Sequence, residues 1–319
     1  MRRAIFGASV LLLLLALATR AGADDAPGFA SQSLNLATST PFSGDEQIPV
    51  ELLRPVGEGR FPAIVIVHDC SGLGPRSGGA PRRWAAVLAA QGYVILMPDS
   101  FSTRGFPDGV CTAPADTPDA NLRKVGTLAQ AFDAYAALAY LRQQNFVDGA
   151  HVGLMGGSHG GGATLLAVAM PTSDQAPLAE QKRHGFAAAI ALYPGCAGRY
   201  GNWSVERQAG TQGPVTAYVG TYRAIAPLLI LIGSADDWTP AEHCQALANA
   251  ADQAIPVRLK IYPGARHSFD SFAPTRFIAT RRNPNAPDGR GATTGGDAAA
   301  WADAIQEVTR FFAARLKNE

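Results

Sequence analysis

Charged side chains are scarce in this sequence, where they make up 17% of 319 residues, and neither sign forms a long run. The formal net charge is only +1. Composition therefore gives no reason to expect a nucleic acid as a partner. Apolar residues, by contrast, make up 47% of the chain, which is enough for the core of one large domain or two small ones.

Apolar runs of membrane-spanning length are also missing. The N-terminal run Ala4–Thr19 falls short of the roughly 20 residues that a transmembrane helix needs. It follows Arg2-Arg3 and precedes Ala21-Gly22-Ala23, which is the layout of a secretory signal peptide. We therefore predict a signal peptide over residues 1–23, a periplasmic or secreted protein, and no membrane contact after cleavage. An uncleaved anchor is the alternative, and the general secretory route is favoured over the twin-arginine route.

Cysteine is rare, and its spacing excludes common metal sites. No C-x-x-C occurs, so no metal is expected. In an exported chain the cysteines are expected to form disulfides, and buried free thiols are the alternative. Three full pairings are open at this point. The four residues concerned are Cys70, Cys111, Cys196 and Cys244.

Two kinds of segment alternate along the chain from Phe61 onward. The predicted buried strands are Phe61–Val67, Tyr93–Met97, His151–Met155, Ala187–Tyr193, Leu228–Ile232 and Val257–Tyr262. The predicted helices are Arg82–Gln91, Asn121–Gln144, Gly161–Met170, Ala241–Ala251 and Asp297–Leu316. This alternation predicts an α/β fold with a mostly parallel twisted sheet and helices on both faces.

Other stretches extend or interrupt this pattern. Ser31–Pro55 is expected to add two strands at the sheet edge. Ala197–Ala226 and Pro274–Gly296 lack the alternation, and we expect each to be either a functional loop or a plain surface excursion. We predict a single domain over residues 24–319.

A glycine-rich stretch surrounds one serine. Ser158 lies in G-G-S-H-G, between a predicted strand and a predicted helix. A nucleophilic serine on such a strained turn needs small residues two positions before and after it. A phosphate-binding loop would need a lysine that is absent here, whereas a purely structural turn remains an alternative.

A serine nucleophile needs a base and a group that orients the base. His267 follows the last predicted strand, and Asp236 follows the strand before it, in the chain order Ser, Asp, His. Asp237 is the rival carboxylate, and the five other histidines are rival bases. The backbone N–H groups of His159 and Cys70 are expected to form the oxyanion hole, although Cys70 could serve only as a disulfide partner.

Several motifs together resemble the dienelactone hydrolase family of α/β-hydrolases. They are V-I-V-H-D-C-S-G-L, P-D-S-F-S-T-R-G, M-G-G-S-H-G-G-G, L-I-G-S-A-D-D-W-T-P and Y-P-G-A-R-H-S-F. The resemblance implies a single-domain α/β-hydrolase fold, no cofactor, and hydrolysis of esters or lactones through an acyl-enzyme. The founding enzymes carry cysteine at Ser158 and glutamate at Asp69.

The resemblance also has implications for binding residues. Arg104 resembles the first of two arginines that grip a substrate carboxylate in the family, and the second position falls at Asp270 and Ser271. The carboxylate of a dienelactone would meet the negative charge of Asp270 there, which favours an ester other than a dienelactone. That ester could be a small molecule or a polymer. Aromatic residues expected to line the pocket, or else to pack in the core, are Tyr193, Trp238, Tyr200 and Trp203.

The resemblance implies a pairing of the cysteines as well. In this fold the strands before Cys196 and Cys244 are neighbours, so these two are expected to pair, which leaves Cys70 for Cys111. The predicted function is a serine carboxylic-ester hydrolase. A serine peptidase of the prolyl-oligopeptidase type and an inactive binding protein are the alternatives, and the ester and the oligomeric state stay open.

Overall fold

A computed structural model describes residues 28–114, 116–172, 178–209 and 212–317. The predicted signal peptide, residues 1–23, lies outside the described residues. No helix in the described part of the chain combines the length and the apolar character that crossing a membrane requires.

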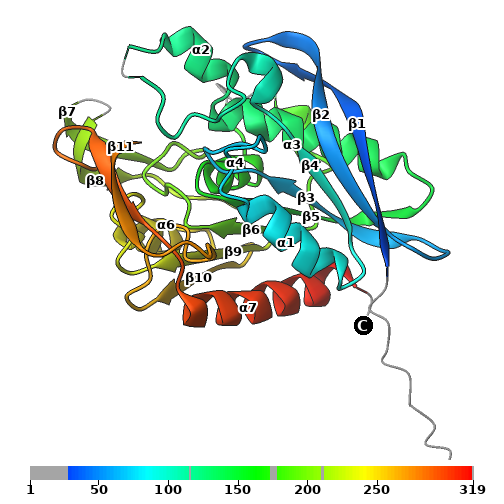
Figure 1. Cartoon of the computed structure of the whole chain (residues 1–319). Coiled ribbons are helices and arrows are strands. Elements are labelled where there is room, and N and C mark those ends of the chain that lie inside the picture. Colours follow the sequence, from blue (N-terminus) through cyan, green and yellow to red (C-terminus); the bar gives the residue numbers. More distant parts are fainter. Residues whose placement is uncertain (1–27, 115, 173–177, 210–211, 318–319) are drawn as a thin grey trace, which may run out of the picture.

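Eight strands form the main sheet (Figure 1). In spatial order they are β1 (Phe29–Thr40), β2 (Gly44–Pro55), β4 (Val94–Pro98), β3 (Phe61–Val67), β5 (Val147–Gly157), β6 (Ala188–Leu192), β9 (Leu228–Gly233) and β10 (Val257–Tyr262). The first two pairs along this order are antiparallel, and all pairs from β4 to β10 are parallel. The predicted mostly parallel sheet and its two early edge strands are confirmed.

Helices cover both faces of this sheet. The helices of the described residues are α1 (Ala80–Ala89), α2 (Asp119–Lys124), α3 (Thr127–Arg142), α4 (His159–Ala167), α5 (Ala179–Lys182), α6 (Ala241–Asn249) and α7 (Ala298–Leu316), with a 3-10 turn η1 (Ser102–Arg104). Figure 1 shows α1 and α7 in front of the sheet, and α3 and α4 behind it.

One helix prediction is wrong in its continuity. The segment predicted as a single helix, Asn121–Gln144, is broken into α2 and α3 at Val125 and Gly126. Gly126 is extended there, with φ −73° and ψ 168°, so the helical hydrogen bonds cannot run through. The break lets α2 diverge from α3, and Leu122 of α2 lines the same cavity as Ser158.

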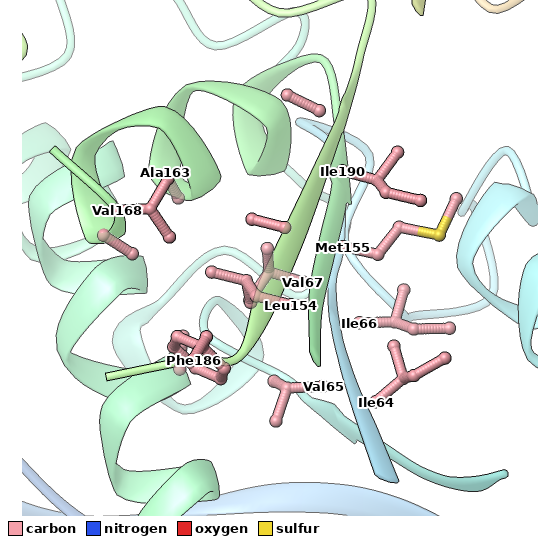
Figure 2. Packing of buried hydrophobic residues seen from close by; sticks show 14 of the residues in the cluster. Ile64, Val65, Ile66, Val67, Leu154, Met155, Ala163, Val168, Phe186 and Ile190 are labelled. Carbon is pink, nitrogen blue, oxygen red and sulfur yellow. The ribbon is translucent and has the colours of Figure 1, made fainter. Parts of the chain in front are cut away.

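The core shows why both faces of the strands are apolar. Along β3, Ile64 and Ile66 point to one side and Val65 and Val67 to the other, where α4 packs (Figure 2). All four are at most 2% exposed. Because successive side chains of a strand alternate between faces, a sheet covered on both faces needs apolar residues throughout.

The two stretches that broke the sequence pattern each contain a β-hairpin. Their strands are β7 (Ser204–Ala209), β8 (Gln212–Val219), β11 (Arg276–Arg282) and β12 (Arg290–Thr294). The hairpins meet, because the Gly213 amide donates to the Pro284 carbonyl at 3.1 Å. The β11–β12 hairpin also reaches the predicted base, since the Gly295 amide donates to the His267 carbonyl at 3.0 Å.

Candidate active site

The glycines around Ser158 perform the steric role predicted for them. Ser158 has φ +53°, a left-handed conformation that only a sharp turn imposes on a serine. A Cβ atom on Gly156 would lie 2.3 Å from the Gly160 carbonyl oxygen, and one on Gly160 would lie 2.4 Å from the Val67 carbonyl oxygen. Side chains at these two positions would therefore drive α4 away from β3 and β5.

Ser158, His267 and Asp236 form one hydrogen-bonded chain. His267 Nε2 lies 2.9 Å from Ser158 Oγ, and His267 Nδ1 lies 2.8 Å from Asp236 Oδ2. His267 and Asp236 are buried, at 0% and 4% exposure, and Ser158 is 9% exposed. An ionised carboxylate only accepts hydrogen bonds, so Nδ1 carries the proton and Nε2 is free to accept the serine proton.

Geometry distinguishes the two neighbouring aspartates, because only Asp236 contacts His267. Asp236 Oδ1 accepts the amides of Trp238 and Thr239, at 2.9 and 2.8 Å, which holds the carboxylate toward His267. Asp237 points elsewhere, to the amide of Thr293 at 2.8 Å. It is therefore a partly exposed carboxylate that holds β12 in place.

Thr239 belongs to the site, although the sequence reasoning missed it. Its Oγ1 donates to Asp236 Oδ2 at 2.9 Å and lies 3.0 Å from His267 Nδ1. The only sequence signal was its place three residues after Asp236, where a hydroxyl can fold back onto the carboxylate. The contact orients the same oxygen that accepts the hydrogen bond from His267 Nδ1.

Tyr193 packs below the site and does not contact substrate space, so the prediction that it binds substrate is wrong. Its side chain is 0% exposed and its hydroxyl donates to Asp270 Oδ1 at 2.9 Å. The ring lies edge-on to His267, with centroids 4.8 Å apart. Tyr193 directly follows the core strand β6, so its side chain lies within the core.

The expected like charge near the substrate is also absent, because Asp270 is fully buried. It accepts hydrogen bonds from Tyr193 and from Trp84 Nε1, the latter at 2.8 Å. Burial raises its pKa above the usual value, while Arg83 and the two hydrogen bonds act in the opposite direction. Asp270 lines neither of the cavities at Ser158.

Arg104, the second corrected binding residue, is part of a buried ion pair. Its Nη1 and Nη2 donate to both carboxylate oxygens of Asp133, at 2.7 and 2.8 Å, and its Nε donates to Glu46 at 2.9 Å. The side chain is 1% exposed and lines neither cavity at Ser158. Arg104 therefore does not bind substrate; it links β2 to α3 through Glu46 and Asp133.

The predicted oxyanion donors, Cys70 and His159, flank the nucleophile. Both residues line the same cavity as Ser158. His159 opens α4, so its amide has no partner within the helix. Cys70 is also bonded to Cys111, which places one disulfide at the active site. The other disulfide joins Cys196 to Cys244, so both predicted pairs are confirmed.

His68 holds the peptide that carries the Cys70 amide. The Ser100 amide donates to His68 Nε2 at 3.1 Å, so the proton of this ring is on Nδ1. Nδ1 then donates to the Asp69 carbonyl at 2.8 Å. In a trans peptide the Asp69 C=O and the Cys70 N–H point in opposite directions, so fixing one aims the other. Burial lowers the pKa of His68, which keeps the ring neutral.

Two cavities meet at Ser158. The first has a volume of about 390 Å³, and its walls are mainly apolar, with Val110, Leu122, Val125 and Tyr200 among them. The second, of about 870 Å³, is more polar than the first and includes His267 and several arginines. Trp238 lines both cavities, and its contact with substrate stays a prediction, whereas Trp203 is 1% exposed and lines neither.

The arginines of the second cavity were not singled out from the sequence. Arg276 and Arg281 come from β11, and Arg76 and Arg83 from the segment around the start of α1. The arginine-rich composition of Pro274–Gly296 was a signal, but the direction of each side chain depends on the hairpin. Burial lowers the pKa of Arg281, while Asp69 acts in the opposite direction.

The described residues offer no good metal site at this place. The group of three potential ligands found among them consists of Asp69, Cys70 and Cys111. Two of these are sulfurs bonded to each other in a disulfide, so neither can be a thiolate ligand.

The fold and the site together define an α/β-hydrolase with a serine, histidine and aspartate at the ends of its strands. The chain belongs to the dienelactone hydrolase family, whose model matches residues 48–316.

Sequence relatives are distant. A putative carboxymethylenebutenolidase from Synechocystis is 24% identical over 275 residues, which cover 85% of this chain and 93% of that protein. The human acylamino-acid-releasing enzyme is 24% identical over 243 residues, which cover 70% of this chain but only 31% of that enzyme.

Solved structures share the fold. A putative dienelactone hydrolase from Klebsiella pneumoniae has a TM-score of 0.58 at 21% identity, covering 89% of this chain and 99% of that one. Esterase 2 of Thermogutta terrifontis, phosphoramylated by tabun, has a TM-score of 0.55 at 16% identity, covering 92% and 96%. Together with the family, these matches support the predicted enzyme class, a carboxylic ester hydrolase.

Proposed function

We propose that this protein hydrolyses carboxylic esters through an acyl-serine intermediate. The observation that carries the proposal is the chain of hydrogen bonds from Ser158 through His267 to Asp236, at 2.9 and 2.8 Å. These distances suit proton transfer from the nucleophile to a base whose ring is already oriented.

In the first half of the reaction, Ser158 Oγ attacks the ester carbonyl while its proton passes to His267 Nε2. The carbonyl oxygen becomes an oxyanion, which accepts hydrogen bonds from the amides of His159 and Cys70. The bond to the alcohol oxygen then breaks, and that oxygen takes the proton from Nε2. Asp236 stabilises the imidazolium while it exists.

In the second half, water replaces the alcohol. His267 takes a proton from the water, whose oxygen attacks the acyl carbonyl. The bond between Ser158 Oγ and the acyl carbon breaks, and the serine regains the proton from Nε2. The products are one carboxylic acid and one alcohol, and no redox step or external cofactor enters the balance.

The test is turnover of p-nitrophenyl acetate by the mature protein beside Ser158→Ala and His267→Gln. We expect each variant to lose at least 10³-fold in kcat, since the serine and the histidine act as a unit. A fluorophosphonate probe should label the wild type, and peptide mapping should find the label on Ser158. Full activity in Ser158→Ala, or a label on another residue, would refute the mechanism.

Peptide hydrolysis is the second candidate, because one relative is the human acylamino-acid-releasing enzyme. This chain spans about a third of that enzyme, so the relation alone does not assign peptide hydrolysis to this chain. Acetyl-alanine p-nitroanilide, assayed beside the p-nitrophenyl ester, separates the two. Faster turnover of the anilide would favour the peptidase.

We also propose that the protein is exported. The two disulfides support an oxidising compartment, and the N-terminal sequence has the layout of a signal peptide. N-terminal sequencing of protein recovered from a bacterial periplasm should begin at Asp24. Recovery of uncleaved protein from the membrane fraction would favour the anchor instead.

A further inference from the structure

The two cavities at Ser158 can be assigned to the two halves of an ester. His267 lines the second cavity and not the first, whereas His159, an oxyanion donor, lines the first and not the second. The departing alcohol oxygen must take its proton from His267 Nε2. The alcohol half therefore lies in the second cavity, and the acyl half lies in the first.

The first cavity suits an uncharged acyl group. Most of its described lining is apolar, and Arg282 is the one member with a fixed charge. Arg282 is turned toward protein, because its Nη1 lies 3.4 Å from the Pro114 carbonyl oxygen. A volume of about 390 Å³ accommodates a compact chain or ring and not a polymer segment.

The second cavity is larger and carries positive charge. Four arginines line it, against the two carboxylates of Asp69 and Asp108. Arg76 is already paired with Asp108, at 3.4 Å. Arg83 donates to the backbone oxygens of Asp270 and Gly78, at 3.0 and 2.8 Å. These two arginines are satisfied by protein, and neither needs a ligand.

Arg276 is exposed, so water can satisfy its charge. Arg281 differs from the other three because it is partly buried and one of its hydrogen-bond donors has no acceptor. Among the described residues its Nε is buried and has no hydrogen-bond acceptor. Its guanidinium lies over the Trp238 ring, 5.2 Å from the centroid, and that ring lies 4.7 Å from the His267 ring. A buried donor without an acceptor is costly. Arg281 also lines the second cavity, so an anion bound there would accept hydrogen bonds from this guanidinium close to the reacting atoms.

We propose, on the basis of the ester hydrolase function above, that the substrate joins a compact apolar acyl group to a larger alcohol or phenol bearing a carboxylate or similar anion, which Arg281 binds. The specificity is therefore asymmetric. A negative charge promotes hydrolysis on the alcohol side and opposes it on the acyl side.

The test for charge compares two acetyl esters that differ in the leaving group, 4-acetoxybenzoate and the neutral 4-acetoxybenzamide. In the wild type we expect the anionic ester to have the higher kcat/KM. Arg281→Gln should lower the ratio of anionic to neutral kcat/KM by roughly 10- to 100-fold, mainly through KM. Arg310→Gln removes an exposed arginine on α7 that is paired with Glu307, and it should leave the ratio unchanged.

The test for the acyl half uses Leu122→Trp, which adds bulk to the first cavity. It should lower the ratio of hexanoyl to acetyl turnover without changing the charge ratio above. Moving the charge to the acyl side, in the succinyl monoester of 4-hydroxybenzamide, should reduce kcat/KM relative to the acetyl ester.

The proposal is overturned if Arg281→Gln lowers turnover of both acetyl esters equally, or if Leu122→Trp changes the charge ratio and not the chain-length ratio. Failure of the ester hydrolase function itself is distinguishable. In that case neither p-nitrophenyl acetate nor 4-acetoxybenzamide would show turnover that depends on Ser158. Turnover that depends on Ser158 but is blind to charge would reject only the role of Arg281.

Discussion

The two disulfides allow a controlled test of how the oxyanion hole is held. Cys70–Cys111 includes a proposed oxyanion donor, whereas Cys196–Cys244 lies between the end of β6 and α6. We compare Cys70→Ala/Cys111→Ala with Cys196→Ala/Cys244→Ala. All four residues are at most 9% exposed, so the two variants remove similar packing.

The expected loss of stability is nearly the same for both pairs. They close loops of 41 and 48 residues by sequence separation. In the chain-entropy account each bond contributes about 4 kcal/mol to the free energy of unfolding, and the two loops differ by only about 0.1 kcal/mol. Any large difference in activity therefore cannot come from global stability.

The expected loss of activity differs. Without its disulfide, the Cys70 segment is still tied by the Val110 and Cys111 amides, which donate to the Cys70 carbonyl at 2.7 and 3.2 Å. We therefore expect kcat to fall about tenfold in Cys70→Ala/Cys111→Ala, below the 10²–10³ that full loss of an oxyanion donor costs. The other double variant should keep the kcat of the wild type.

The assay is p-nitrophenyl acetate hydrolysis at 25 °C, with guanidinium unfolding of the same samples and circular dichroism to show that each is folded. Equal losses of kcat in both variants would refute the reasoning, as would full kcat in Cys70→Ala/Cys111→Ala. A difference in unfolding free energy of several kcal/mol between them would contradict the loop argument.

Three further outcomes follow from the same contacts. In the first, His68→Asn keeps a donor near the position of Nδ1, which holds the Asp69 carbonyl, whereas His68→Gln keeps a group near the position of Nε2 instead. His68→Asn should therefore retain the higher kcat. Equal kcat values at equal melting temperature would contradict the idea that the bond to the Asp69 carbonyl aims the Cys70 amide. Burial lowers the pKa of His159 to about 4, whereas its pKa in the unfolded chain is about 6.5. Because the unfolded state takes up the proton first, the free energy of unfolding falls as the pH drops from 6.5 toward 4. His159→Leu should remove at most about 3 kcal/mol of that fall in urea unfolding, and an unchanged pH profile would contradict it. Gly160→Ala should lower the free energy of unfolding by about 1–3 kcal/mol and also lower kcat, because the new Cβ would lie 2.4 Å from the Val67 carbonyl oxygen. If the variant kept the melting temperature and the kcat of the wild type, α4 could move away from β3 without penalty and the prediction would be wrong.

Much of the catalytic arrangement could be predicted because local rules govern it. The apolar strands, the turn at Ser158 and the carboxyl ends that carry Asp236 and His267 depend on short segments. Parallel strands bring those ends to one edge, so their order along the chain was enough to predict which side chains meet. The disulfide pairs were implied by the family resemblance, in whose fold the strands before Cys196 and Cys244 are neighbours.

The binding residues could not be predicted in this way. Arg104 and Tyr193 have the residue types of a binding site, yet both are buried and hydrogen-bonded to carboxylates of the core. Arg281 stands in a segment without clear periodicity and reaches the site only because β11 and β12 pair as a hairpin. Periodicity shows whether a side chain faces a core, but it does not show which neighbour will satisfy its charge.

The sequence by itself determined the class of fold and predicted the proposed nucleophile and the candidates that would activate it, since each depends on a motif of a few residues at a strand end. Only the tertiary structure decided which of two aspartates faces His267, which arginines are neutralised inside the protein, and that two cavities of different polarity meet at Ser158. The physical reason is that these properties arise between segments far apart in the chain, where packing fixes the partner of each polar group.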